Sequence, residues 1–184
     1  MASLQGHLLI ASPNLPDPNF FRSVVLIIEH DDAGAFGLIL NRTTYRHLSE
    51  FLDEDNFSED ARNVRLAVGG PVEGPFLVLH SSPEFGDPEI VPGVYLGRSS
   101  NSLCEMIQQK GYPFRAFVGY SGWGEGQLEI ELESGSWLTL PATSEHVFEL
   151  DEEDVWEQAV MSVGTQKTKD FFKIHHVADD PSWN

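Results

Sequence analysis

The most informative stretch of the sequence is Gly119–Glu129 (GYSGWGEGQLE), in which four glycines surround a serine and a tryptophan. Glycine is used this densely where the backbone needs a positive φ or where another group lies against the main chain. We therefore predict a tight loop here and take it as the first place to search for a site. The segment that follows, Gln127–Glu133, fits either a strand or a short helix.

Length and composition indicate one globular domain. The chain has 184 residues, of which 41% are hydrophobic and 11% aromatic, enough to bury a sizeable core. Cys104 is the only cysteine, so an internal disulfide is excluded and a reducing compartment is expected. The N-terminus lacks the basic and long apolar regions of a signal peptide, and we expect a cytoplasmic protein.

The formal net charge of −18 is the strongest bulk property of the chain. A field of this sign repels phosphate backbones and anionic lipid surfaces. Because the sequence also lacks a helix-turn-helix pattern, we expect neither specific binding to duplex DNA nor membrane association. The charge would attract a basic protein partner. Alternatively, its only role is to keep the protein soluble.

Apolar runs bounded by turn residues predict a largely antiparallel sheet. Two hairpins are expected: Ser23–Glu29 with Phe36–Leu40, and Val64–Val68 with Phe76–Leu79 across the glycines at 69–74. Further strands are expected at Leu8–Ala11, Val94–Leu96, Phe114–Gly119 and Trp137–Leu140. Helical patterns cover His47–Asp53, Ser100–Lys110 and Asp151–Val163, the last stopped by Gly164. Strands and helices mixed without regular alternation indicate an α+β fold.

The glycine-rich stretch resembles two catalytic motifs and fits neither. A nucleophile elbow needs glycine two residues after the serine, where this chain has Trp123. A phosphate-binding loop would place an anion beside Glu125 and Glu129. We therefore interpret the stretch as a sharp turn in which Trp123 packs as a plug. We do not expect Ser121 to act as a nucleophile.

Two arginines give a more specific hypothesis. If Ser23–Glu29 pairs with Phe36–Leu40, Arg22 lies almost opposite Arg42 at the open end of that hairpin. Like charges this close are unfavourable unless an anion lies between them. A small anionic ligand, or a protein carboxylate such as Asp17 or Glu50, would fill that role.

The histidines and the cysteine give weaker signals. His30 and His80 each end an apolar strand, but their spacing matches no local zinc motif, and we expect no metal and no cofactor. Cys104 lies beside the apolar face of the helix expected over Ser100–Lys110, as a structural thiol would.

Several motifs, in order, resemble the YqgE/AlgH family of bacterial proteins. The resemblance covers about Gly6–Gly164, and the matching motifs are GHLLIASP at 6–13, FFRSVV at 20–25, GLILNR at 37–42, GGPV at 69–72, LH at 79–80 and the glycine-rich stretch. It implies an α+β fold with a mostly antiparallel, bifurcated sheet curled into a pseudo-barrel with flanking helices, and it favours a helix at Gln127–Glu133. Members are largely uncharacterised, and some carry the label of transcriptional regulator.

Two functional hypotheses follow from these observations. The first is a cytoplasmic binding or regulatory module that acts through a protein partner rather than by contacting DNA. The second is a receptor or an enzyme for a small anion. Its pocket would be formed by Arg22, Asn41, Arg42, Gly70, Tyr120, Trp123 and Gln127, whose catalytic roles, if any, the sequence does not define. The absence of a recognisable catalytic set favours the first hypothesis.

The C-terminal segment generates the first testable prediction. Residues 165–184 form a tail after the 1–164 domain, and it carries the apolar residues Phe171, Phe172, Ile174 and Val177. Exposed, such a cluster would promote association, so we expect the domain or a partner subunit to cover it. Truncation after Gly164 should lower the melting temperature or change the elution volume in size-exclusion chromatography. An unchanged melting temperature and relative size would show that nothing covers the tail.

Overall fold

The computed structural model describes residues 3–50, 64–85, 87–98, 111–149 and 154–172, with side chains in the last range as far as residue 165. The N-terminal half contains β1 (His7–Ala11), β2 (Val24–Asp31), β3 (Gly34–Ile39), β4 (Thr43–His47), the 3₁₀ turn η1 (Leu48–Glu50), β5 (Arg65–Val68), β6 (Leu77–His80), η3 (Pro83–Phe85), β7 (Glu89–Val91) and β8 (Val94–Gly97). The C-terminal half contains β9 (Phe114–Val118), β10 (Ser121–Gly124), α3 (Gln127–Glu133), β11 (Trp137–Pro141), α4 (Ser144–Phe148) and α5 (Val155–Phe172).

The first sheet has the strand order β10-β3-β2-β1-β11, and every neighbouring pair in it is antiparallel. Successive side chains of β2 point to opposite faces, and both faces are covered. Leu26 and Ile28 join the core shared with the second sheet, whereas Val25 and Ile27 pack toward Trp123. Burial on both faces explains why β2 is a continuous apolar run rather than an alternating one.

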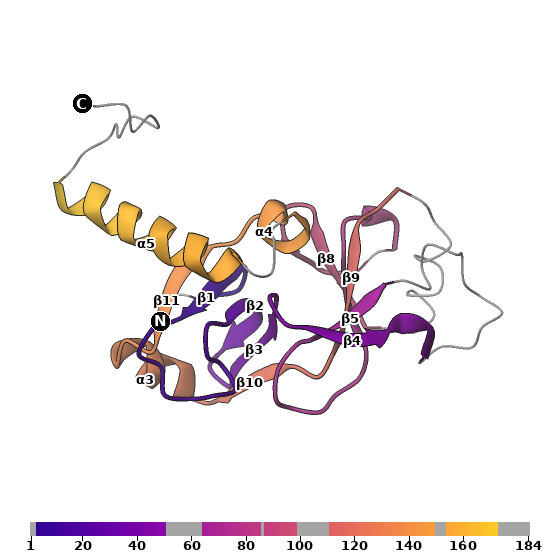
Figure 1. Ribbon diagram of the computed structural model, residues 1–184, viewed down its shortest axis with the longest axis horizontal. Helices are drawn as coiled ribbons and strands as arrows, with labels where there is room; N and C mark the ends of the chain where they lie inside the picture. The colour runs from indigo at the N-terminus through magenta and orange to yellow at the C-terminus, as the bar shows by residue number, and fades with distance from the viewer. Residues whose placement is uncertain (1–2, 51–63, 86, 99–110, 150–153, 173–184) are drawn as a thin grey trace.

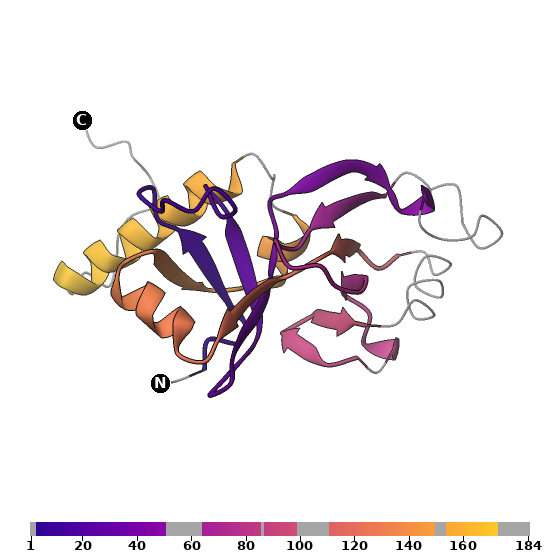
Figure 2. The same cartoon turned by 90° about the horizontal axis from the view of Figure 1, so that it is seen from below.

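The second sheet has the order β4-β5-β9-β6-β8-β7. The hairpin predicted between Val64–Val68 and Phe76–Leu79 is wrong, because β9 lies between β5 and β6 and pairs with both. Its pairing with β5 is parallel, the one parallel pair among the described strands. Figure 2 shows β4 and β5 on one side of β9 and the strands β6 to β8 on the other. The fold is α+β and mainly antiparallel, as predicted, with two packed sheets that do not close into a barrel.

Two helices cover the first sheet on opposite faces (Figure 1). On α3, Leu128 packs with Trp123 and Trp137, which confirms the helix that the family resemblance favoured at Gln127–Glu133. On the other face, α5 lies against β1 and β11, and its Trp156 indole donates a 2.8 Å hydrogen bond to the carbonyl of Ala11. None of the described helices is long and apolar enough to cross a membrane.

Several local predictions need correction. Gly164 does not stop the last helix, because α5 continues to Phe172. The Gly119–Gly126 stretch is not a loop throughout, since Ser121–Gly124 forms β10. Where a helix was expected from His47, the chain forms the end of β4 and then η1. The helix predicted over Ser100–Lys110, with Cys104, and the tail side chains lie outside the described residues, so these remain predictions.

Close backbone contacts explain the paired glycines at 69 and 70. A Cβ on Gly69 would lie 2.3 Å from the carbonyl oxygen of Gly119, and one on Gly70 would lie 2.3 Å from the backbone of Tyr120. Beyond this contact, Val72 and Tyr120 exchange two backbone hydrogen bonds of 3.0 and 2.9 Å. Glycine is required here because the two backbones touch.

Replacing Gly69 with alanine should therefore destabilise the fold. The added methyl meets a carbonyl and the Leu38 side chain, and overpacking of this kind costs about 1–3 kcal/mol. The free energy of unfolding, measured by urea denaturation, should fall accordingly. Gly124→Ala is the matched control, because a Cβ there meets nothing within 4 Å. Equal stability of the two variants would contradict this account of the crossing.

Candidate functional site

The aromatic half of the glycine-rich stretch is part of the core. Trp123 is 5% exposed, and its ring lies 5.9 Å from those of Phe20 and Trp137, measured between centroids. One carboxylate oxygen of Glu131 accepts both indole N–H groups, at 2.9 Å from Trp123 and 2.8 Å from Trp137. Gln127 completes the set by donating to the other Glu131 oxygen at 2.9 Å. The interpretation of Trp123 as a packed plug agrees with this geometry.

Ser121 has a structural role as well. Its side chain is fully buried, and its hydroxyl donates a 3.0 Å hydrogen bond to the carbonyl of Gly69. A hydroxyl committed to a backbone carbonyl has no base to activate it as a nucleophile. Ser121 thus adds a side-chain hydrogen bond to the contact between the segments at 69–72 and 119–121.

The hairpin register places Arg22 and Arg42 at the open end of β2 and β3, as predicted. Val25 pairs with Ile39 and Leu26 with Leu38, and the register shifts by one residue between Ile27 and Glu29. Beyond the last pair, the Asn41 side chain accepts from the Val24 amide at 2.9 Å and donates to the Arg22 carbonyl at 2.8 Å. Asn41 thereby extends the pairing to residue 22.

The two guanidinium groups face different carboxylates. Arg22 lies 3.8 Å from Glu157 of α5 and 5.0 Å from the centre of the Trp156 ring. Arg42 donates to the Phe21 carbonyl at 3.3 Å. Partial burial lowers the pKa of Arg42, and the negative charge of Asp17 opposes that shift. Glu157 and Asp17 thus place protein carboxylates near the two arginines, which is the predicted alternative to a bound anion.

The seven predicted site residues fall into three groups. Arg22, Asn41 and Arg42 lie at the open end of the hairpin, while Trp123 and Gln127 surround Glu131. Tyr120 and Gly70 meet at the backbone crossing, where the Tyr120 ring also packs edge-on against Phe36. The 620 Å³, 290 Å³ and 390 Å³ cavities of the described residues are each lined by residues of at most one of these groups. Ligand binding by these seven residues stays a prediction.

A cleft of about 620 Å³ opens beside the turn between β2 and β3, and the sequence analysis did not identify it. It lies where that turn and the start of α3 come together, and its lining consists of Ser3, His30, Asp31, Asp32, Glu125, Gly126 and Glu129. The volume is in the range of small-molecule and peptide-side-chain sites. Glu125 and Glu129 belong to the glycine-rich stretch, but their proximity to Asp31 and Asp32 depends on the pairing of β10 with β3.

His30 connects two segments that border this cleft. Its Nδ1 accepts the Leu4 amide at 2.9 Å, so the ring proton resides on Nε2, which lies 2.8 Å from Glu129 Oε1. The imidazole thereby links the N-terminal segment at Leu4 to the first turn of α3. The His30 side chain is 4% exposed.

His80, the other strand-end histidine, is enclosed. Its Nε2 lies 3.0 Å from an Asp87 oxygen, and its buried Nδ1 has no hydrogen-bond partner in the described chain. The rings of Phe85 and Tyr95 flank it, each with its centre 5.7 Å away. Partial burial and the neighbouring Glu89 carboxylate raise the pKa of Tyr95. Among the described residues, no three His, Cys, Asp or Glu side chains could hold a metal ion.

The cleft generates a prediction about pH. Hydrogen bonds from its own backbone amide and from His30 lower the pKa of Glu129 below the ordinary 4.5. A carboxyl with a lowered folded-state pKa stabilises the fold above its unfolded-state pKa and loses that contribution as the pH falls through the folded-state value. Glu129→Gln should therefore destabilise the protein at neutral pH, and the difference in unfolding free energy should shrink below about pH 4.

Urea denaturation across this pH range measures the effect, and Glu125→Gln is the control. Glu125 is an exposed carboxylate of the same cleft, and its side chain forms no hydrogen bond with a described residue. Its replacement should leave the pH profile nearly unchanged. Parallel profiles for Glu129→Gln and the unmodified protein would contradict a role for the His30–Glu129 bond in stability.

Solved structures of other proteins have the same fold. The AlgH protein from Pseudomonas aeruginosa superposes with a TM-score of 0.74 at 28% identity, with 96% of each chain covered. A protein from Corynebacterium diphtheriae superposes with a TM-score of 0.69 at 23% identity, covering 88% of this chain and 87% of that one. The second likeness shows a shared fold.

Sequence relatives identify the family. A UPF0301 protein from Shewanella sp. (strain W3-18-1) is 39% identical over 175 residues, covering 89% of this chain and 93% of the relative. One from Chlorobaculum tepidum is 39% identical over 165 residues, covering 86% of each. The model of the AlgH-like family matches residues 8–168. The chain therefore belongs to the AlgH-like family, in agreement with the resemblance seen in its motifs.

Proposed function

We propose that this protein is a binding module that takes a basic segment of a partner protein in the acidic cleft. The observation that carries the proposal is the convergence of Asp31, Asp32, Glu125 and Glu129 on one concavity. Of these four carboxylates, Glu129 alone has a side-chain hydrogen-bond partner among the described residues, and that partner is His30. The other three are exposed and have no described cation to neutralise them.

The concave shape of the cleft suits one inserted lysine or arginine side chain better than it suits a flat, positively charged surface. A concave site with low-dielectric walls focuses the field of its charges and attracts oppositely charged groups from solution. The net charge of −18 adds long-range attraction for a basic partner and repulsion for nucleic acid. Any regulatory role would then act through the partner, in the cytoplasm, rather than by direct contact with DNA.

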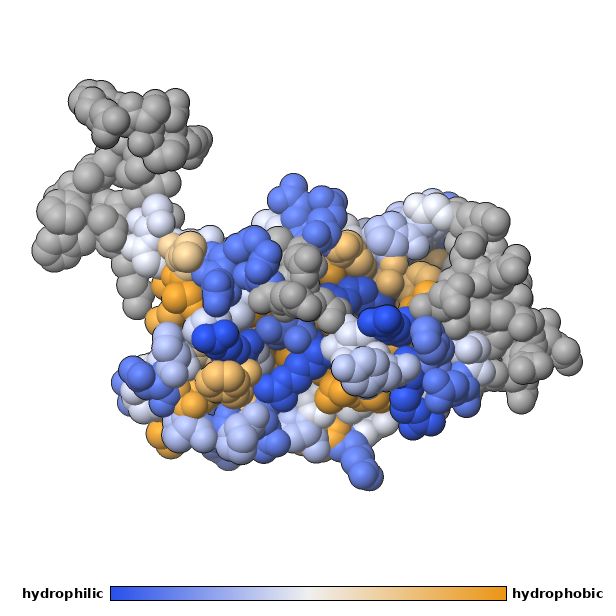
Figure 3. Space-filling view, in the orientation of Figure 1, coloured by the Kyte–Doolittle hydropathy of each residue, from blue (hydrophilic) through white to orange (hydrophobic). Residues whose placement is uncertain are grey.

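Other parts of the surface support a polar binding mode. Figure 3 shows one face of the molecule, where hydrophilic residues dominate and hydrophobic ones form small, separate patches. A receptor built on Arg22 and Arg42 has less support, because Glu157 and Asp17 already place negative charge beside those arginines. The acidic cleft is the better candidate because three of its carboxylates form no ion pair with a described residue.

The proposal predicts salt-dependent binding of a basic peptide at the cleft. The probe is a fluorescently labelled peptide of alternating lysine and alanine, with affinity measured by fluorescence anisotropy. The double variant Asp32→Asn/Glu125→Gln should weaken binding about tenfold, since two rim charge pairs of up to about 1 kcal/mol each are lost. Both residues are exposed, so folding should not be affected.

The matched control removes the same two charges elsewhere. Glu145→Gln/Glu149→Gln acts on an exposed residue of α4 and on the exposed residue that caps its C-terminus, and Figure 1 shows α4 apart from α3. This variant should change the affinity less than twofold at 150 mM salt. If the two double variants weaken binding equally, the peptide reports net charge alone and the cleft is not the site.

A further inference from the structure

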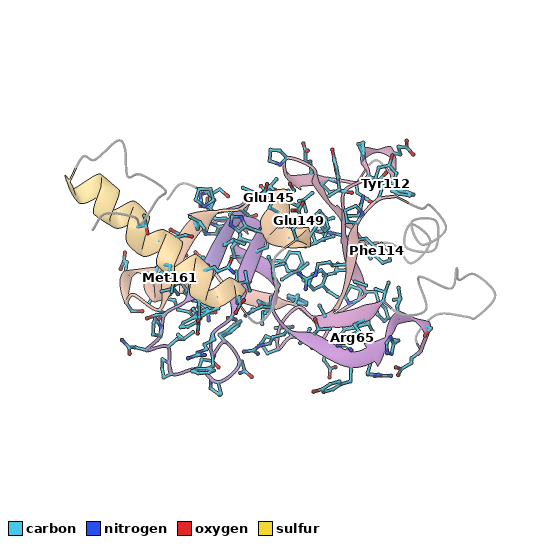
Figure 4. All side chains as sticks on the ribbon, turned by 45° about the horizontal axis from the view of Figure 1, so that its top comes forward. Arg65, Tyr112, Phe114, Glu145, Glu149 and Met161 are labelled. Carbon is cyan, nitrogen blue, oxygen red and sulfur yellow. The ribbon has the colours of Figure 1, made fainter. Side chains whose placement is uncertain are left out.

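A cavity of about 390 Å³ lies beyond the ends of β5 and β9. β5 ends at Val68 and β9 at Val118, and these two residues are paired in the parallel ladder. Figure 4 labels the residues with which the two strands begin, Arg65 and Phe114, at the other end of that ladder. In open α/β sheets, ligands bind outside the carboxyl ends of parallel strands, and this cavity has the same position.

Gly70 brings unpaired main-chain groups to the cavity. The residue is buried against the backbone of Tyr120, and neither its N–H nor its carbonyl forms a hydrogen bond with a described residue. The backbones of Gly69 and Val72, on either side, are both hydrogen-bonded. Because buried backbone groups are paired almost without exception in folded proteins, the groups of Gly70 need a partner from outside the chain.

Gly119 adds a second bare stretch of main chain from the β9 side. It is half-buried, with a φ of 68°, and its N–H and carbonyl also form no hydrogen bond with a described residue. Since glycine has no side chain, a ligand can come close to the backbone of both residues. A free N–H donor beside a free carbonyl acceptor matches the edge of an amide, which offers one acceptor and one donor of its own.

The rest of the lining determines the shape and charge of the ligand. Val68, Val118 and Val72, which is 38% exposed, supply aliphatic walls. Glu73 is the one charged residue in the lining, and it forms no ion pair with a described residue. A carboxylate without a neighbouring cation repels anions, which argues against a phosphate or carboxylate ligand.

We propose that this cavity binds a small neutral amide with a compact aliphatic body. The edge of the amide would pair with the main chain of Gly70, and the valines would hold the body. The volume is in the range of small-molecule sites. The site shares no lining residue with the acidic cleft, so either site can exist without the other.

The test uses ε-caprolactam as the probe, titrated into the full-length protein labelled with ¹⁵N. Caprolactam should shift the amide proton resonances of Gly70 and Gly119 downfield and saturate, because an amide proton moves downfield when it is hydrogen-bonded. Sodium hexanoate, a carboxylate of similar size, should not saturate. The absence of a saturable shift at these two glycines would show that water alone fills the cavity and would overturn the proposal.

A matched ligand tests the role of the amide edge. N-methylcaprolactam keeps the ring and the carbonyl but lacks the N–H donor. It should bind about fivefold more weakly than caprolactam, since one net hydrogen bond is worth about 1 kcal/mol. Equal affinity for the two lactams would show that the main chain does not recognise the amide, and would overturn the site.

A pair of truncations tests the aliphatic wall. Val72→Ala removes two methyl groups from the lining and should weaken caprolactam binding about threefold. The two hydrogen bonds between Val72 and Tyr120 are backbone bonds, so the fold should be retained. Ile130→Ala is the control, because Ile130 is an exposed aliphatic residue of α3 outside the lining, and it should leave the affinity unchanged. Equal losses in the two variants would place the lactam elsewhere and overturn the proposal.

Discussion

The contact between the backbones of residues 69–72 and 119–121 determines how the two sheets are arranged. The Gly69 amide donates to Val118, which ends β9, and the Gly69 carbonyl accepts the Ile39 amide, which ends β3, both at 2.9 Å. Gly69 therefore bonds to one strand of each sheet, and β9 and β10 pass from the second sheet into the first at the same point. No side chain larger than hydrogen fits there, so two short glycine motifs far apart in the sequence act as one unit.

The same arrangement separates the charges of the molecule. At one end, the pairing of β10 with β3 brings the start of α3 to the β2–β3 turn and gathers carboxylates around His30. At the other, the parallel pairing of β5 with β9 brings Arg65 beside Arg115. A chain with a formal charge of −18 thus still places two of its few cations on neighbouring strands. Net charge governs long-range encounter, whereas the register of neighbouring strands decides what each cavity can hold.

Local patterns in the sequence predicted the features that depend on local interactions. The β2–β3 hairpin follows from its two apolar strands, which pair as predicted, with Glu29 opposite Phe36. The predicted pairing of Val64–Val68 with Phe76–Leu79 failed because turn chemistry between two strands cannot reveal a third strand that inserts from some forty residues later. Gly164 failed as a helix stop because an interior glycine costs only about 1 kcal/mol, less than packing against a sheet supplies.

Both cavities escaped the sequence analysis for the same physical reason. Most of their lining residues are individually unremarkable in the sequence, being single carboxylates or valines within ordinary strands and turns. What distinguishes them is proximity across strands, which depends on the antiparallel pairing of β10 with β3 for the acidic cleft and on the parallel pairing of β5 with β9 for the cavity at the ends of those strands. The glycine-rich stretch is conspicuous in the sequence because of its composition. Its main role is to let the neighbouring strands approach and pair without steric clashes. Dense glycine thus identified the structural junction, and the acidic cleft adjoins it through Glu125 and Glu129, whereas Asp31 and Asp32 reach the cleft from the β2–β3 turn.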